Sequence, residues 1–163
     1  MKKNKVYFIV SWVAVLAVAV AIFLFSAQDA QESTEVSHGL IERIVLWYTR
    51  CFGIPCSTGQ LVQISAFWDH FVRKLAHFSI YTLLGFCCCN ACYHTFFRLK
   101  KSFGISFIAG VFYAISDEIH QLFVPGRSCQ FSDMVLDSCG VLVGVLLFFT
   151  LFLIITKRRS VRI

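Results

Sequence analysis

Ionisable side chains recur at helical spacing in three short segments of this chain. Residues three, four or seven positions apart fall on one face of a helix, so each segment would present its polar groups together. Histidine beside carboxylates supports general acid–base catalysis, and the same groups also form ion pairs. The three sets are Lys74, His77 and Tyr81; Tyr113, Asp117, His120 and Gln121; and Asp133 and Asp137.

The surrounding sequence predicts that these sets lie on membrane-spanning helices. Of the 163 residues, 58% are hydrophobic and only 15% are charged, whereas about a quarter of an ordinary soluble domain is charged. A spanning helix needs about 20 mostly apolar residues, and four segments qualify: 6–25, 75–93, 103–124 and 134–156. We expect an all-α fold, in which residues 1–163 form a single integral membrane domain built as a bundle of four transmembrane helices.

Basic residues gather in the three segments that four crossings place on one side of the membrane. This is the positive-inside distribution, which puts both termini of a multi-pass protein in the cytoplasm. It accounts for the net charge of +6 without a nucleic-acid partner. A cleaved signal peptide is the alternative for the first span, but its apolar run of about 20 residues exceeds the usual 7–15. The basic residues are Lys2, Lys3 and Lys5; Arg98, Lys100 and Lys101; and Lys157, Arg158, Arg159 and Arg162.

The long outer connection, residues 26–72, contains an amphipathic segment. Apolar residues recur at helical spacing between Val36 and Phe52, and polar and charged residues take the opposite face. This pattern predicts a helix lying in the outer membrane interface, although a helix that caps the bundle without touching lipid fits equally well. The quartet Ser57–Gln60 is typical of a capping box that opens a helix, which we expect to continue into the second span.

All three polar sets are predicted to lie at the depth of the outer leaflet. His77 comes at the outer start of the second span, Asp117 near the outer end of the third, and Asp137 at the outer start of the fourth. An acid at the centre of a membrane helix costs about 2.5–3.5 kcal/mol, and less toward the interface. We therefore expect these groups to face a wet cavity inside the bundle. The alternative is a cluster that only holds the helices together.

Three blocks of the sequence contain nearly all residues of the three polar sets: FSAQDAQESTEVS at 25–37, RKLAHFSIYTLLGF at 73–86 and SDEIHQLFVPGRSCQFSDMVLDSCGVLVG at 116–144. Together they resemble the VanZ-like family of membrane proteins. The resemblance implies a bacterial cytoplasmic membrane and an association with resistance to glycopeptide antibiotics, teicoplanin above all, but no settled enzymatic activity. One departure is Ile80, at a position that is often acidic in the family.

Matching these blocks to the family's motifs selects the candidate site residues. Glu118 lies one residue off its helical stripe, so we expect it to face the loop or a neighbouring helix. No cofactor and no metal is assigned, although a metal site of His77, Asp117, His120 and Asp137 stays open as an alternative, because helical spacing alone is a weak signal. The candidates for catalysis are His77, Asp117, His120 and Asp137, and those for substrate binding are Gln28, Lys74, Tyr81, Glu118, Gln121, Arg127 and Asp133.

Three functions are compatible with these residues. The first is a non-catalytic envelope protein whose outer pocket binds a membrane lipid headgroup or a lipid-linked envelope precursor, with Lys74, Arg127 and His120 holding a phosphate. The second is an intramembrane hydrolase or transferase on a lipid-linked substrate, with His77 or His120 as general base. The third is a proton-coupled transporter, which the inner halves of the helices disfavour because they carry no matching polar path.

Overall fold

The structure is a computed structural model that describes residues 5–53 and 56–160, with side chains to residue 158. Five α-helices lie in these ranges. No strand occurs in these ranges, and the predicted all-α class is confirmed. Lys2, Lys3 and Arg162, members of the predicted cytoplasmic basic segments, lie outside the described residues. The helices are α1 (Lys5–Ser26), α2 (Ala30–Phe52), α3 (Thr58–Phe96), α4 (Leu99–Gln121) and α5 (Phe131–Ser160).

Four of the helices, α1, α3, α4 and α5, are long and apolar enough to cross a membrane, as predicted. The second span is the C-terminal part of the much longer α3, which has 39 residues. At 1.5 Å per residue this helix is about 58 Å long, roughly twice the thickness of a hydrocarbon core. It begins where the capping box was predicted: the Gln60 side chain accepts from the Ser57 N–H at 2.9 Å, and Ser57 Oγ accepts from the Gln60 N–H at 3.3 Å.

The connection between α4 and α5 starts earlier and ends earlier than the hydropathy pattern predicts. α4 ends at Gln121, and the N–H groups of Phe123 and Val124 bond to carbonyls three residues back, which closes the helix with a tight turn. Pro125 follows and disfavours a helical conformation in the residue before it. α5 begins at Phe131, so that both of its acids lie in its first two turns.

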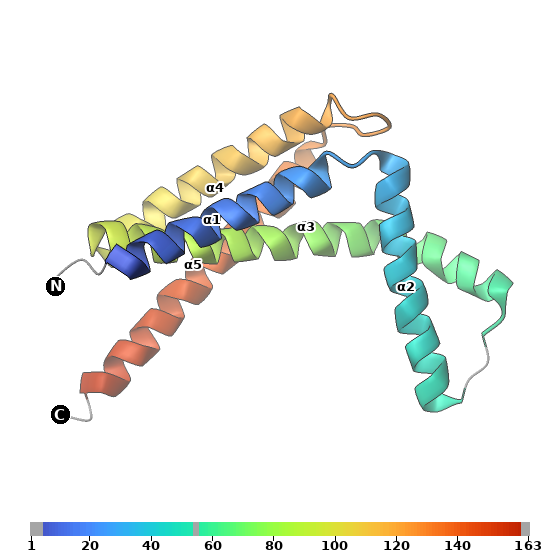
Figure 1. The fold of residues 1–163 in the computed structure, drawn as a ribbon, viewed down its shortest axis with the longest axis horizontal. Helices are drawn as coiled ribbons and strands as arrows, with labels where there is room; N and C mark the ends of the chain where they lie inside the picture. Colours follow the sequence, from blue (N-terminus) through green and yellow to red (C-terminus); the bar gives the residue numbers. More distant parts are fainter. Residues whose placement is uncertain (1–4, 54–55, 161–163) are drawn as a thin grey trace.

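The two ends of the bundle differ in what they carry. Figure 1 shows the chain termini and the α3–α4 turn at one end, and the α1–α2 connection and the α4–α5 loop at the opposite end. α2 runs across this second end, and the N-terminal part of α3 extends beyond it. The basic residues Arg98, Lys100 and Lys101 therefore lie at the same end as the start of α1, as the positive-inside pattern requires of four crossings.

Close packing of α5 on α3 depends on two glycines. A Cβ added at Gly140 would lie 2.6 Å from the carbonyl oxygen of Phe78, and one added at Gly144 would meet the carbonyl oxygen of Thr82. The small-residue spacing in α5 is thus a helix-packing feature. This contact sets the depth at which the acids of α5 face α3.

α2 corresponds to the predicted amphipathic helix but starts earlier, at Ala30, because Asp29 caps it by accepting from the Glu32 N–H at 2.8 Å. Ile41 is buried, and most other large apolar residues of α2 are exposed. An apolar face that the protein leaves uncovered suits an interfacial helix better than a cap over the bundle. The exposed apolar residues are Val36, Leu40, Ile44, Leu46, Trp47, Tyr48 and Phe52.

Candidate functional site

A pocket of about 200 Å³, here called the polar pocket, lies at the end of the bundle that carries the α4–α5 loop. Its walls come from α3, from the last turn of α4 with the following loop, and from the first two turns of α5, while the start of α2 closes one side. The lining residues are Ala30, His70, Arg73, Lys74, His77, Glu118, Gln121, Gly126, Arg127, Ser128, Gln130, Asp133, Leu136 and Asp137.

Two basic residues of the polar pocket form ion pairs. Lys74 Nζ lies 2.8 Å from Asp133 Oδ1, which joins α3 to α5. Arg73 Nη1 lies 4.0 Å from Asp69 Oδ2, one turn earlier on α3. All four side chains are partly exposed, so each pair contributes at most about 1 kcal/mol to stability. Both basic groups can therefore exchange their partner for another anion at small cost.

Glu118 holds the α4–α5 loop against the pocket. The residue is almost completely buried, and its Oε2 accepts from the Gln130 N–H at 3.0 Å. A buried carboxylate normally keeps such a partner, because leaving it unpaired costs far more than the hydrogen bond contributes. The predicted orientation of Glu118 toward the loop agrees with this contact.

Arg127 lies at the edge of the pocket and has only neutral partners. Its Nη1 donates to Gln121 Oε1 at 3.4 Å and its Nη2 to the Phe25 carbonyl at 3.3 Å, while its Nε is buried without a hydrogen-bond partner. Burial, with a smaller contribution from the nearby Arg73 charge, lowers the pKa of the Arg127 guanidinium from its ordinary value. Arginine nevertheless keeps its charge in proteins, so Arg127 is a cation that no carboxylate of the described residues contacts.

The base of the pocket carries a group that we call the acid–histidine cluster. His77 and Asp137 of this cluster line the pocket, and Tyr81 and Asp117 lie beneath it. Asp137 is fully buried, and neither of its carboxylate oxygens has a hydrogen-bond partner. The nearest basic group among the described residues is His77, whose Nδ1 lies 3.7 Å from Asp137 Oδ2. The Tyr81 hydroxyl is also buried and unpartnered. The cluster therefore holds polar groups that the described residues do not satisfy.

Asp117 is the one acid of the cluster with hydrogen-bond partners. Its Oδ2 accepts from Ser26 Oγ at 2.8 Å and from Gln121 Nε2 at 3.4 Å. Ser26 is the last residue of α1, so this contact ties α1 to α4 at the depth of the cluster. Asp117 lies below the polar pocket and does not line it.

A second space of about 230 Å³, here called the apolar groove, adjoins the polar pocket between α1, α2 and α3. Its walls are mostly hydrocarbon. Arg73, His77 and Arg127 line both spaces. The groove is lined by Ile22, Phe25, Gln28, Ser33, Val36, Ser37, Leu40, Val72, Arg73, Ala76, His77, Ile80 and Arg127.

Most of the candidate residues selected from the sequence come together, in two layers. Asp117 and Tyr81 belong to the layer beneath the pocket, and Gln28 lines the apolar groove instead of the polar pocket. The candidates that line the polar pocket are Lys74, His77, Glu118, Gln121, Arg127, Asp133 and Asp137.

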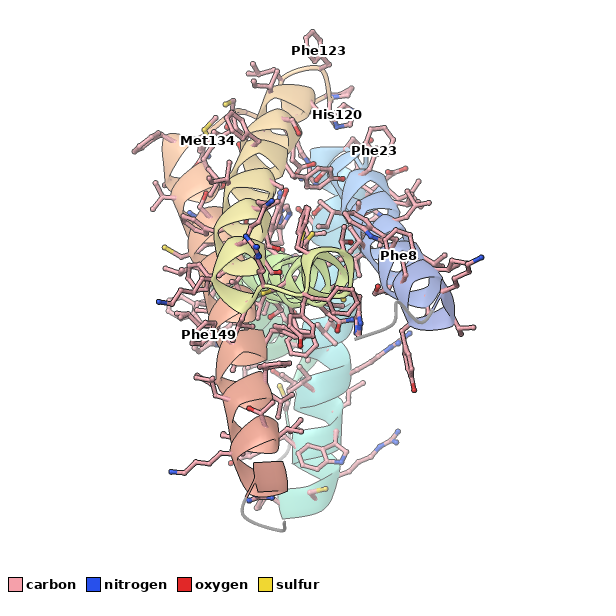
Figure 2. The ribbon with its side chains drawn as sticks, turned by 90° about the vertical axis from the view of Figure 1, so that its left-hand side faces the viewer. Phe8, Phe23, His120, Phe123, Met134 and Phe149 are labelled. Atoms are coloured by element: carbon pink, nitrogen blue, oxygen red, sulfur yellow. The ribbon has the colours of Figure 1, made fainter. Side chains whose placement is uncertain are left out.

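His120 lies away from these groups. Its ring stacks on Phe23 of α1, with ring centroids 4.7 Å apart, and Figure 2 shows the two labelled residues together. A helix turns by about 100° per residue, which puts Glu118 and Gln121 on one side of Asp117 and His120 on the other. Because the pocket lies on the side of Glu118, the structure offers no support for His120 as a phosphate ligand or general base.

Two basic residues of the polar pocket and one hydrogen-bond partner of the cluster were absent from the sequence-based candidates. His70 and Arg73 line the polar pocket, and Ser26 binds Asp117. His70 is four residues before Lys74 and lies on the same face of the helix. It was missed because the second span was assumed to begin at residue 75. Ser26 stands in the first of the three sequence blocks, so the motif contains a signal for it.

Four helices long and apolar enough to span a membrane, three of which line a polar pocket, are typical of a multi-pass helical membrane protein. The family model described as VanZ/LLP1 matches residues 10–154, which is most of the chain. The protein therefore belongs to the VanZ/LLP1 family, and the resemblance of the three sequence blocks is confirmed. Comparisons with curated proteins and with solved structures find no match.

Proposed function

We propose that this VanZ-family membrane protein binds a phosphate-bearing membrane amphiphile, with the headgroup in the polar pocket and the hydrocarbon chain in the apolar groove. Arg127 is the observation that carries the proposal. It lines both spaces, its Nε is buried without a partner, and no carboxylate of the described residues forms an ion pair with it.

A phosphate would satisfy Arg127 better than its present neutral contacts. The planar guanidinium binds phosphate oxygens through two parallel charge-assisted hydrogen bonds. Arg73 and Lys74 face the same pocket and are held only by weak, partly exposed ion pairs. Glu118 is engaged by the loop backbone, which limits its repulsion of an incoming anion.

The apolar groove favours an amphiphile over a free anion. It shares a wall with the polar pocket, so one molecule can place a charged headgroup in one space and a hydrocarbon chain in the other. The chain would be buried among apolar residues of α1, α2 and α3 such as Ile22, Leu40 and Ile80. A free phosphate would leave this groove unused.

We further propose that the site faces outward in the bacterial cytoplasmic membrane, with both termini in the cytoplasm. The support is the basic α3–α4 turn, at the end of the bundle opposite the pocket. Phospholipids and lipid-linked envelope precursors are the phosphate-bearing amphiphiles available on that side. Sequestering a precursor would alter its exposure to teicoplanin-type antibiotics, the association that the family resemblance implies.

Lipid retention by the purified protein tests this proposal. The full-length protein in mild detergent, treated with EDTA, is offered phosphatidylglycerol, a polyprenyl phosphate or inorganic phosphate, and the bound species is identified by native mass spectrometry. Arg127→Gln removes a contact worth about 1.5–3 kcal/mol and is expected to weaken amphiphile binding at least tenfold. The matched control is Arg98→Gln, at the opposite end of the bundle, which is expected to bind as wild type.

The ligands separate the possible sources of the phosphate. Binding of either amphiphile supports the proposal and names the class, and binding of inorganic phosphate with equal affinity would show that the groove contributes nothing. An equal affinity of wild type and Arg127→Gln for every ligand would contradict the proposal.

The pair His77–Asp137 favours a second candidate function, hydrolysis or group transfer on the same amphiphile. An imidazole whose Nδ1 faces a carboxylate is oriented to act as general base through its other nitrogen. His77 lines both the pocket and the groove, so it would adjoin the headgroup. Mass spectrometry of the recovered ligand tests this function: a shortened product formed by wild type and absent with His77→Gln supports it, and recovery of intact ligand contradicts it for that substrate.

A further inference from the structure

The acid–histidine cluster contains a buried carboxyl group that its neighbours do not satisfy. Asp137 has no exposed surface, and both of its oxygens lack hydrogen bonds. His77 Nδ1, at 3.7 Å from Oδ2, is beyond normal hydrogen-bond distance. An ionised carboxylate in this position is strongly disfavoured unless a positive charge compensates it. The lipid-binding proposal does not address this, because a phosphate headgroup supplies no positive charge to Asp137.

We propose that His77, Asp117 and Asp137 together bind one divalent transition-metal cation, of the Mn²⁺ or Zn²⁺ class. One ligand atom from each residue lies within 4.8 Å of the other two. Ligands around an ion with bonds of about 2.0–2.2 Å lie roughly 3–4 Å apart, so small side-chain rotations complete the geometry. One imidazole nitrogen with two carboxylates suits these ions, whereas Mg²⁺ and Ca²⁺ prefer oxygen ligands alone.

Tyr81 supports the site independently of the three ligands. Its side chain is fully buried, and its hydroxyl lies next to the carboxylate of Asp117 and close to that of Asp137 without a well-formed hydrogen bond to either. Carboxylates that bind metals are commonly oriented by hydrogen bonds from a second layer of residues. The Tyr81 hydroxyl is placed to donate such a bond.

Asp117 is oriented in the same way. Ser26 and Gln121 both donate to its Oδ2, which leaves Oδ1 to coordinate the ion. A divalent cation would then neutralise the two negative charges of Asp117 and Asp137, with His77 neutral. The inference goes beyond the proposed lipid binding and does not depend on it.

Metal titration in the absence of lipid tests the inference. The purified protein in detergent is stripped with EDTA, the chelator is removed, and Mn²⁺ is titrated by calorimetry, with electron paramagnetic resonance reporting the bound ion. Mn²⁺ is the main probe because the eight cysteines would bind Zn²⁺ elsewhere on the chain. Wild type is expected to bind one ion per chain, and Asp137→Asn and His77→Gln are each expected to weaken binding at least a hundredfold.

Two matched variants serve as controls. Asp133→Asn changes the other acid of α5, one turn away, and His120→Gln changes a histidine outside the cluster; both are expected to bind Mn²⁺ as wild type. Bound Mn²⁺ should also raise the melting temperature of wild type and of both controls but not that of the two cluster variants. Absence of stoichiometric binding by wild type, or equal binding by all five proteins, would overturn the inference. Should Asp137→Asn fail to fold, His77→Gln decides, since His77 is partly exposed.

The outcomes separate this inference from the lipid proposal. Lipid binding is measured after EDTA treatment and depends on Arg127, whereas Mn²⁺ binding is measured without lipid and depends on Asp137. Failure to observe lipid binding therefore does not contradict the metal site, and failure to observe Mn²⁺ binding does not contradict the lipid proposal.

Discussion

The half of the bundle around His77 and the half around Cys89 are both built on α3 and α5, but they bury different kinds of side chain. In the second, which we call the cysteine half, Leu84, Cys89, Val145 and Phe148 form a continuous apolar core. In the first, the pocket half, the buried residues include Asp117, Glu118, Gln121 and Asp137. Packing stabilises the cysteine half, whereas the pocket half contains groups whose burial opposes folding unless they are paired.

This difference indicates where the function lies. A protein that needed only stability would continue the apolar core through both halves, because an apolar replacement of a buried charge is often neutral or stabilising. The glycine contacts of α5 with α3 span the boundary between the halves and hold them in register. Three experiments test the comparison.

The largest effect is expected from Gly144→Leu, at the boundary. A Cβ there would meet the Thr82 carbonyl and lie 2.7 Å from the Phe86 backbone nitrogen, so α5 must move away from α3 and disturb both halves. We expect a loss of about 3 kcal/mol or more in the free energy of unfolding, measured by denaturant titration in detergent. The control is Gly104→Leu on α4, where no heavy atom lies within 4 Å of an added Cβ. A similar loss in both variants would show that the close approach of α3 and α5 is not required.

A pair of smaller changes contrasts the halves directly. Val145→Ala removes methyl groups from a fully buried site and is expected to lower the free energy of unfolding by about 1–3 kcal/mol. Asp137→Asn, in the EDTA-treated protein, removes a buried charge and is expected to leave stability unchanged or raise it by up to about 2 kcal/mol. Chemical denaturation of the two variants side by side measures both effects. Equal losses would mean that the halves do not differ in how they are stabilised.

The smallest effect is expected at the rim of the pocket. The pair Lys74–Asp133 is partly exposed, so a double-mutant cycle of Lys74→Met and Asp133→Asn should give a coupling free energy of at most about 1 kcal/mol. A coupling free energy above about 2 kcal/mol would show that this pair holds α3 and α5 together, and that Lys74 is not available to an incoming anion.

The fold was predictable from the sequence except for the positions of some helix ends. Length and hydropathy located all four spans, because a membrane sets the number of apolar residues that each needs. Hydropathy alone did not locate the start of α3, because the helix continues through Asp69, Arg73 and Lys74, but the capping-box pattern at Ser57–Gln60 predicted it correctly. The early start of α2 depends in the same way on a single capping residue, Asp29.

The site was predictable in position but not in detail. Helical spacing brings Lys74, Asp133 and Asp137 to one depth, and the structure places them there together. Spacing could not tell whether Glu118 or His120 faces the pocket, because the rotation of α4 about its own axis is set by its packing against the other helices. The lack of hydrogen-bond partners for the Asp137 oxygens likewise depends on tertiary packing, so local sequence patterns could not predict it.

Two hydrogen bonds tie the α4–α5 loop to the α1–α2 connection: Arg127 Nη2 to the Phe25 carbonyl, and the Ala30 N–H to the Pro125 carbonyl, both at 3.3 Å. α2 leaves its apolar face uncovered, so lateral pressure among the surrounding lipids would act on it directly. A tilt of α2 would act through the Ala30–Pro125 bond on the loop that carries Arg127 and change the width of the pocket. Loosely and tightly packed membranes are therefore expected to hold this pocket at different widths.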